Sequence, residues 1–286
     1  MDLARAKSVI IALLVAFNLF LLFNNLIYFR GQGVQKETIK NTEVILKARG
    51  VTLECPIPSA SKGTHRLKYG NGKLDRSAIA LNLLGGLNRA NDDWNGFEYA
   101  GKKLVFSSDT EFVFTDDNPA SEIDVGAEAV VKKAAQEYLK NKGLLNGRYV
   151  VDELKRGQNG SVVVSFIEVY DGFLIYDNYS KITLNSKGVA QLEYRKLQII
   201  GFSAGKVEDL AAAYQVLLAH FKEGSEQVIT RIDNGYKYTD EYSIDGMESA
   251  ELLPVWRIKI KADPVPLYLG ALDDEKGSVV DSSDDQ

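Results

Sequence analysis

The sequence predicts an α+β protein in which helices pack on antiparallel β-sheets, as repeated helix-plus-sheet units, with one N-terminal transmembrane helix. Three observations predict this class. Residues 9–29, "VIIALLVAFNLFLLFNNLIYF", carry no charge. Two segments, within 124–143 and 207–221, place apolar side chains at helical spacing. Elsewhere, short runs rich in Val, Ile, Phe and Tyr are separated by Gly, Asn and Asp turns, which is typical of antiparallel strands.

Residues 9–29 have the length and composition of a membrane-spanning helix. An α-helix of this length extends roughly 32 Å, close to the hydrocarbon thickness of about 30 Å. Fifteen of its 21 residues are Leu, Ile, Val or Phe, and each favours insertion by about 0.3–0.6 kcal/mol. A cleaved signal peptide would end in small residues, whereas this run ends in "NNLIYFRGQG". We therefore expect a single-pass protein of the cell membrane, with a cytoplasmic N-terminus and an extracytoplasmic C-terminal domain.

Two features of this helix exceed what an anchor requires. Ser8, Ala12 and Ala16 recur at every fourth position, the spacing that lets two helix backbones approach in lipid. Asn18 lies near the middle of the span and Asn25 lies seven residues later on the same face. An amide in hydrocarbon is costly without a partner, so Asn18 favours a helix–helix contact. The alternatives are that the small residues are common fillers and that Asn25 marks the wet end of the helix.

The first part of the domain begins with a juxtamembrane helix at 35–50 that ends at Gly50. A second helix, at 74–86, is expected to start at an Asp75 cap and to end at Gly85. Strands are predicted at 51–55, 65–69, 97–108 and 111–119.

A clearer pattern follows from residue 121. The helix in 124–143 buries one stripe and stops at Gly143. The stripe consists of Ala127, Val130, Val131, Ala134, Tyr138 and Leu139. An antiparallel meander is then predicted, with strands at 148–156, 161–170, 173–178, 180–185 and 189–200.

The same order recurs about eighty residues later, which we interpret as a weak internal repeat. The helix at 207–221 presents a stripe of Leu210, Ala211, Tyr214, Leu217 and Leu218. Strands are predicted after it at 229–238, 252–262 and 266–272. The expected division is a cytoplasmic stub with the transmembrane helix (1–30), a juxtamembrane helix with an α+β region (31–120), two helix-plus-sheet units (121–200 and 201–278) and an acidic tail (279–286).

The composition excludes some classes of function. A formal charge of −5 and the lack of a Lys/Arg cluster argue against nucleic-acid binding. Cys55 is the single cysteine, so it forms no internal disulfide, and we interpret it as a small hydrophobe rather than a reactive thiol.

No catalytic set is recognisable, and we expect neither a metal nor a cofactor. The only histidines, His65 and His220, lie far apart in sequence, and a structural role at a helix end is favoured for His220. No zinc or nucleophile-elbow pattern occurs. Asp92 and Asp93 beside Trp94 could imitate a sugar-binding loop, but a solvated Asn/Gly/Asp loop is favoured.

Five segments together resemble the YycI family and its YycH relatives. They are "MDLARAKSVIIALLVAFNLFLL" at the start, "VILKARGVTLECPIP" after the membrane, "SFIEVYDGFLIYDNYSKITLNSKGVAQLEY" in the middle, and "GYKYTDEY" and "LLPVWRIKI" near the end. They occur in this order over most of the chain. The final "PVWRIKI…YLGALDDEKG" also resembles PepSY-like modules.

The resemblance implies an extracytoplasmic α+β domain without enzymatic activity. It implies a regulatory protein that modulates the sensor histidine kinase of the YycFG (WalRK) cell-wall two-component system, together with a YycH-like protein. The membrane helix would contact the transmembrane helices of the kinase, which assigns helix–helix contact to Ser8, Ala12, Ala16, Asn18 and Asn25. The alternative function is an anchored module that binds peptidoglycan or, as PepSY-like proteins do, modulates a wall hydrolase.

Overall fold

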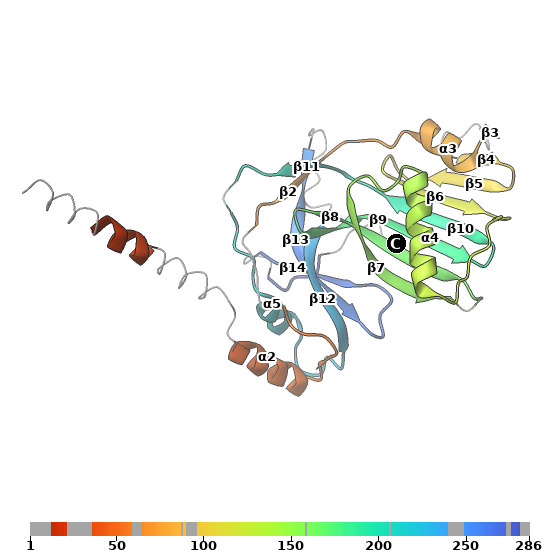
Figure 1. Cartoon of the computed structure of the whole chain (residues 1–286). Helices are drawn as coiled ribbons and strands as arrows, with labels where there is room; N and C mark the ends of the chain where they lie inside the picture. The colour runs from red at the N-terminus through yellow and green to blue at the C-terminus, as the bar shows by residue number, and fades with distance from the viewer. Residues whose placement is uncertain are drawn as a thin grey trace, which may run out of the picture. The chain divides into compact units, whose positions relative to one another are not determined.

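A computed structural model shows the chain as two compact units, each assembled from segments far apart in sequence (Figure 1). The structure describes residues 13–21, 36–58, 64–86, 88–89, 96–157, 159–205, 207–239, 249–272 and 276–280. Unit 1 comprises Met1–Gly63, Asp209–Asp233 and Ile258–Ser278, and unit 2 comprises Thr64–Glu208, Asn234–Arg257 and Val279–Gln286. The predicted domains run contiguously along the chain, and their boundaries stay a prediction.

The predicted α+β class is confirmed, since helices accompany a largely antiparallel set of strands. The described part of the chain contains no helix with the length and apolar character needed to cross a membrane. The transmembrane helix therefore stays a prediction.

Unit 2 contains an antiparallel array of eight strands in the order β3, β4, β5, β6, β10, β9, β8, β7. The strands are β3 (Asn88–Arg89), β4 (Gly96–Tyr99), β5 (Lys102–Phe106), β6 (Glu111–Asp116), β7 (Arg148–Arg156), β8 (Val162–Tyr170), β9 (Phe173–Asn185) and β10 (Gly188–Arg195). The predicted antiparallel meander is thus confirmed for β7 to β10.

Unit 2 contains a second group of strands, whose pairing was not predicted from the sequence. β2 (Leu67–Gly70) lies between β11 (Gln198–Phe202) and β13 (Ser249–Ile260), antiparallel to both. β12 (Val228–Lys237) pairs in parallel with the start of β9. The residues of β12 and β13 are divided between the two units.

Four predicted strands are divided or joined differently in the structure. The stretch 97–108 is a hairpin, because Ala100 and Gly101 both have positive φ (52° and 77°) and turn the chain between β4 and β5. The stretches 173–178 and 180–185 form one strand, β9. The stretch 189–200 divides into β10 and β11, which pair with different neighbours.

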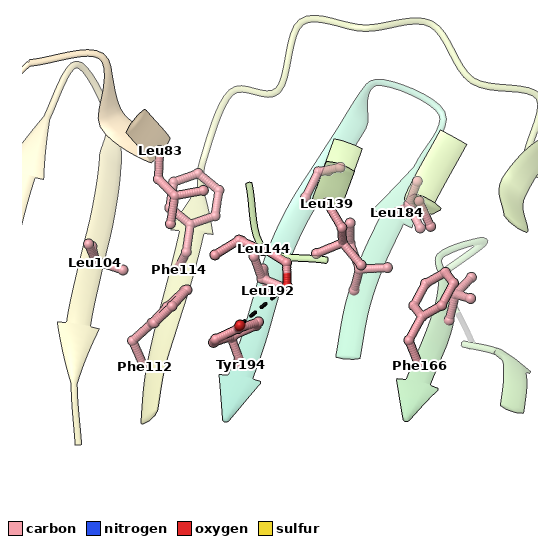
Figure 2. Packing of buried hydrophobic residues seen from close by; sticks show 14 of the residues in the cluster. Leu83, Leu104, Phe112, Phe114, Leu139, Leu144, Phe166, Leu184, Leu192 and Tyr194 are labelled. Carbon is pink, nitrogen blue, oxygen red and sulfur yellow. Dashed lines mark hydrogen bonds between the residues drawn. The ribbon is translucent and has the colours of Figure 1, made fainter. Parts of the chain in front are cut away.

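One face of the antiparallel array is covered by α3 (Arg76–Leu84) and α4 (Glu128–Asn141), which pack on β4 and β5 and on β8 and β9, respectively. α3 begins as predicted: the Asp75 side chain accepts a hydrogen bond from Ala78 N at 3.0 Å, and Gly85 closes the helix with φ 78°. Figure 2 shows the core beneath these helices, where Tyr194 Oη donates to Leu144 O at 3.2 Å.

The predicted stripe of α4 is right for Val131 and Leu139, which are fully buried. It is wrong for Val130, which is 45% exposed, and it omitted Ala135, which is fully buried. The helix is rotated slightly from the expected face, because Val131, Ala135 and Leu139 form a single row of positions four apart.

Unit 1 contains α2 (Lys36–Ala48), β1 (Thr52–Leu53), α5 (Ala213–His220) and β14 (Leu267–Gly270). α2 packs on α5 through its buried residues Thr42 and Leu46. Just beyond α2, Arg49 donates from Nη1 to Leu218 O (2.8 Å) and Phe221 O (2.7 Å), which satisfies carbonyl groups at the end of α5. β1 pairs in parallel with Val228 and Ile229 of β12.

The helix predicted at 207–221 is shorter than expected. Ala211 N donates to Ala271 O at 2.8 Å, and Ala212 N donates to the Gln215 side chain at 2.9 Å, so these groups are satisfied outside a helix. Leu210 and Ala211 are buried as predicted, but from extended chain. Tertiary contacts therefore move the start of the helix to Ala213.

Candidate functional site

The predicted contact helix is described only over residues 13–21, which are helical. Ala16 and Asn18 lie in this part, whereas Ser8, Ala12 and Asn25 lie outside the described residues. Every side chain from 13 to 21 is exposed. The large apolar side chains, each 47–65% exposed, are Leu13, Leu14, Val15, Phe17, Leu19, Phe20 and Leu21.

Such a helix is apolar around its whole circumference and has no face buried against the rest of the described chain. A helix with this pattern requires an apolar environment on all sides. Within it, Asn18 Nδ2 donates to Leu14 O at 2.9 Å, one turn earlier. An amide has two N–H donors and an acceptor oxygen, so this bond leaves hydrogen-bonding capacity for a neighbour. The proposed contact role of the five residues stays a prediction.

A second set of polar residues is buried in unit 2, along β9. Asn178 is fully buried and donates from Nδ2 to Glu168 Oε2 (2.6 Å) and to Leu197 O (3.1 Å). Its Oδ1 accepts from Leu197 N at 2.6 Å. The side chain thus bonds both backbone polar groups of Leu197, two residues after β10 ends at Arg195. At Leu197, the Asn178 side chain therefore makes the two hydrogen bonds that a neighbouring strand would make within a sheet.

Lys196 completes this part of the network. Its Nζ donates to Glu168 Oε1 (3.2 Å), to Tyr149 Oη (3.1 Å) and to Asn146 O (2.8 Å). Burial raises the pKa of the Tyr149 phenol well above its ordinary value, and the neighbouring charge of Glu168 adds to the effect. Glu168, itself 8% exposed, is therefore held by an ammonium and an amide at once.

Asp177 is the next buried carboxylate on β9 and is 2% exposed. Its Oδ2 accepts from Tyr238 N at 2.6 Å. Its Oδ1 lies 3.6 Å from Lys237 Nζ and 4.0 Å from Arg195 Nη1. This carboxylate therefore connects the end of β12 with β9 and β10 by charge-assisted contacts.

Arg257 of β13 forms the most buried ion pair described, with Asp152 of β7. The two Nη atoms lie 3.0 and 2.6 Å from the carboxylate oxygens, a bidentate geometry. The guanidinium lies over the Tyr176 ring at 4.6 Å from its centroid. The side chains of Arg257 and Asp152 are 2% and 8% exposed, so both charges are largely removed from water.

These polar residues share no pattern in the sequence that predicts them as a set. A signal was present: Asp177 and Asn178 interrupt an otherwise apolar run, "FLIYDNYSKITL", which was interpreted as a break between strands. Two aromatic residues of this region, Phe166 and Tyr176, belong to the core and are 2% and 5% exposed.

The other candidates from the sequence have structural contacts where they are described. His220 lies in the last turn of α5 and its Nδ1 is 3.2 Å from Gly277 O, as expected for a structural histidine. Cys55 is half-buried, and burial, followed by the charge of Asp233, raises the pKa of its thiol. Asp92, Asp93 and Trp94 lie outside the described residues. Across the part of the chain that is described, His, Cys, Asp and Glu form no group of three suited to a metal ion.

Three of the segments that carry the resemblance meet in this network. Glu168, Asp177 and Asn178 come from the middle segment, and Lys237 and Arg257 come from the two later ones. Their charged groups are engaged in bonds that hold strands together. These residues of the three segments therefore hold strands of the sheet together.

Of three comparisons with known proteins, one, the family model, bears on the resemblance. No curated protein matches the chain. Among solved structures, the chain is similar to the Bacillus megaterium YpeB C-terminal domain, with 12% identity, 72% of this chain and 97% of that chain covered, and a TM-score of 0.42. The likeness to PepSY-like modules stays a prediction. The model of the YycI protein family matches residues 31–268, which is most of the chain. The predicted family is thereby confirmed, and the chain belongs to the YycI family.

Proposed function

We propose that this chain is a membrane-anchored regulator that changes the activity of the sensor histidine kinase of the YycFG system through contacts of its N-terminal helix. Membership of the YycI family suggests a regulator of the YycFG two-component system, and a regulatory family suggests a role other than catalysis. The anchoring and the contact with the kinase are the further steps of the proposal.

The observation that carries the anchoring is the exposed apolar helix at 13–21. Seven large apolar side chains, each about half exposed or more, would be unfavourable in water by roughly 1.5–3 kcal/mol apiece relative to burial. The uncharged sequence continues on both sides, from Val9 to Phe29. Insertion in a bilayer removes these apolar side chains from water. In the proposed topology, the N-terminus lies in the cytoplasm and both units lie outside.

The contact with the kinase rests on the polar residue in the helix. Asn18 retains hydrogen-bonding capacity beyond its bond to Leu14 O, and lipid cannot use it. A transmembrane helix of the kinase offers partners, and Ala16 and the small residues before it allow close approach. A regulator of this kind needs to shift the kinase equilibrium by only about 1–3 kcal/mol.

The substitution Asn18→Leu tests this proposal. It removes the amide, retains the branched shape of the side chain and makes insertion more favourable, so the protein should enter the membrane normally while the transcriptional output of the kinase changes. The matched control, Leu19→Ile, alters a neighbouring apolar side chain and should leave the output unchanged. Unaltered output in Asn18→Leu, with normal membrane levels of the protein, would contradict the proposed contact.

The family also implies interaction with a YycH-like protein. We assign this interaction to the extracytoplasmic part, which makes up most of the chain. Co-purification from membranes of a chain whose residues 1–30 are replaced by an unrelated apolar helix tests the assignment. Retention of the YycH-like protein is expected, and its loss would move the contact to the membrane helix.

The alternative function, peptidoglycan binding through Asp92 and Asp93, has no described observation in its favour, since that loop lies outside the described residues.

A further inference from the structure

We infer that α2 carries a lipid-binding face that docks on the anionic headgroups of the membrane in which the chain is anchored. The inference rests on the proposed anchoring and goes beyond it, because it assigns a role to a helix outside the bilayer. Lys36, Lys40 and Lys47 are all exposed and make no ion pair or side-chain hydrogen bond with any described residue.

The three lysines share one face of the helix. At 3.6 residues per turn, positions 36, 40 and 47 fall within an arc of about 40°. The buried residues Thr42 and Leu46, which face α5, lie about 120° away on the same projection. Packing of α2 on α5 therefore determines which face of α2 is exposed, and the lysines lie on that exposed face.

An exposed apolar side chain adjoins the lysines. Val44 projects about 180° from the centre of the buried face and is 63% exposed. Lysines beside an apolar side chain are the combination found on helices that lie in the headgroup region. Glu37 and Glu43 are exposed as well, and Glu43 projects about 40° from the middle of the lysine arc, so the attraction is moderate. With only moderate attraction, α2 binds the headgroups only if the membrane surface is always close to it.

Chain length supplies that proximity. If the span ends at Phe29, six residues separate it from Lys36, and they extend roughly 20 Å at most. α2 is itself roughly 20 Å long, as expected for its 13 residues. Tethering at this distance converts weak attraction into an intramolecular contact with a high effective concentration. The occupant that is always within reach is the lipid surface, and its anionic headgroups complement the lysines.

Lysine reactivity in the full chain tests the inference. The protein is reconstituted in nanodiscs of phosphatidylcholine alone or of phosphatidylcholine with phosphatidylglycerol, and acetylation by a water-soluble ester is followed at each lysine by mass spectrometry. We expect the rates at Lys36, Lys40 and Lys47 to fall roughly threefold to fivefold with phosphatidylglycerol. High salt should restore them, because it screens the attraction. The exposed Lys140 and Lys187 of unit 2 are internal controls whose rates should not change.

Equal rates in the two lipids would overturn the inference, as would protection that is already complete in phosphatidylcholine, since neither outcome depends on anionic headgroups. Failure of the chain to enter nanodiscs would instead contradict the proposed anchoring. A variant with Gln at positions 36, 40 and 47 should expose the α2 backbone to hydrogen exchange equally in both lipids. The charge-matched variant with Gln at positions 133, 140 and 187 should behave as the unaltered chain does.

Discussion

The ion pair of Asp152 and Arg257 holds two full charges away from water, with side chains 8% and 2% exposed. Their mutual attraction offsets a large desolvation cost only while both partners are present. Stacking on Tyr176 fixes the plane of the guanidinium. The pair therefore acts as a geometric constraint between β7 and β13 more than as a source of net stability.

Removal of one partner should be costly. We expect Asp152→Ala to lower the free energy of unfolding by about 3–5 kcal/mol, because it removes the carboxylate to which a buried guanidinium is bonded in bidentate geometry. Urea unfolding of the full chain in detergent measures the change. Lys155→Ala, which breaks the exposed pair with Glu153, is the control and should cost less than about 1 kcal/mol. A loss in Asp152→Ala no larger than in the control would show that the pair is not desolvated in solution.

Tyr194 provides a prediction for alkaline pH. Burial raises the pKa of its phenol to about 12, and the charge of Glu168 contributes. The folded state therefore holds the proton more tightly than the unfolded state, whose value is near 10. The resulting stability is complete below pH 10 and is lost as pH rises towards 12, by about 2–3 kcal/mol in total.

The substitution Tyr194→Phe isolates this effect. At pH 7 the variant should be about 1 kcal/mol less stable, since it lacks the hydrogen bond to Leu144 O. Between pH 10 and 12 the difference should shrink and then reverse, because only the tyrosine form ionises on unfolding. Unfolding curves of the two proteins across this range provide the measurement. Parallel losses of stability in both would rule out Tyr194 as a source of the pH dependence.

At the scale of elements, the parallel contact between β12 and β9 depends on one glycine. Gly235 lies opposite Leu174, and a Cβ at this position would be 2.3 Å from Leu174 O and 2.8 Å from the Tyr176 ring. Backbone cannot move aside as the end of a flexible side chain can. Gly235 is therefore required for the approach of the two strands.

We expect Gly235→Ala to destabilise the protein by more than about 2 kcal/mol, through overpacking against backbone. Gly205→Ala is the matched control, because the nearest atom to its Cβ is Ser203 Oγ at 4.0 Å and its φ is not positive. It should change stability by less than about 0.5 kcal/mol. Equal thermal unfolding midpoints for the two variants would contradict the close approach.

Elements with local signals were predictable from sequence, and elements fixed by distant contacts were not. The Asp75 cap and Gly85, only ten residues apart, define the two ends of α3, so its limits matched. The start of α5 depends on Ala271, some sixty residues away from Ala211, and was misplaced. β9 was divided in two because Asp177 and Asn178 are turn formers on the surface, whereas here buried partners satisfy them.

The candidate site was predictable to the same degree. An uncharged apolar run with asparagines is a local signal, so the N-terminal helix could be selected directly from the sequence. The partners of Asn178 come from residues ten and nineteen positions away, and those of Arg257 from 105 positions away. Hydrophobic periodicity in the sequence carries no information about contacts between residues so far apart in the chain. These groups come together only in the folded protein.

At the scale of the whole molecule, the proposed mechanism separates the membrane helix from the two units. Replacement of residues 1–30 by an unrelated apolar helix should keep the protein in the membrane and abolish its effect on the kinase, because the helix–helix contact is lost. Reporter expression under control of the response regulator is the measurement. An unchanged effect would favour the alternative in which the extracytoplasmic part acts alone, as PepSY-like modulators do.

The division of β12 and β13 between the units has a consequence for biosynthesis. Unit 2 needs residues up to Arg257, and unit 1 joins α2 to segments that end at Ser278. Unit 1 therefore cannot gain its native packing until nearly the entire polypeptide has been delivered, whereas the main core of unit 2 lies within residues 80–194 and can form earlier. In the proposed topology, in which the chain is threaded through the membrane from its N-terminus, α2 would remain without α5 for the time needed to deliver well over a hundred residues. Agents that act on unfolded chains outside the cell would meet this protein in that interval.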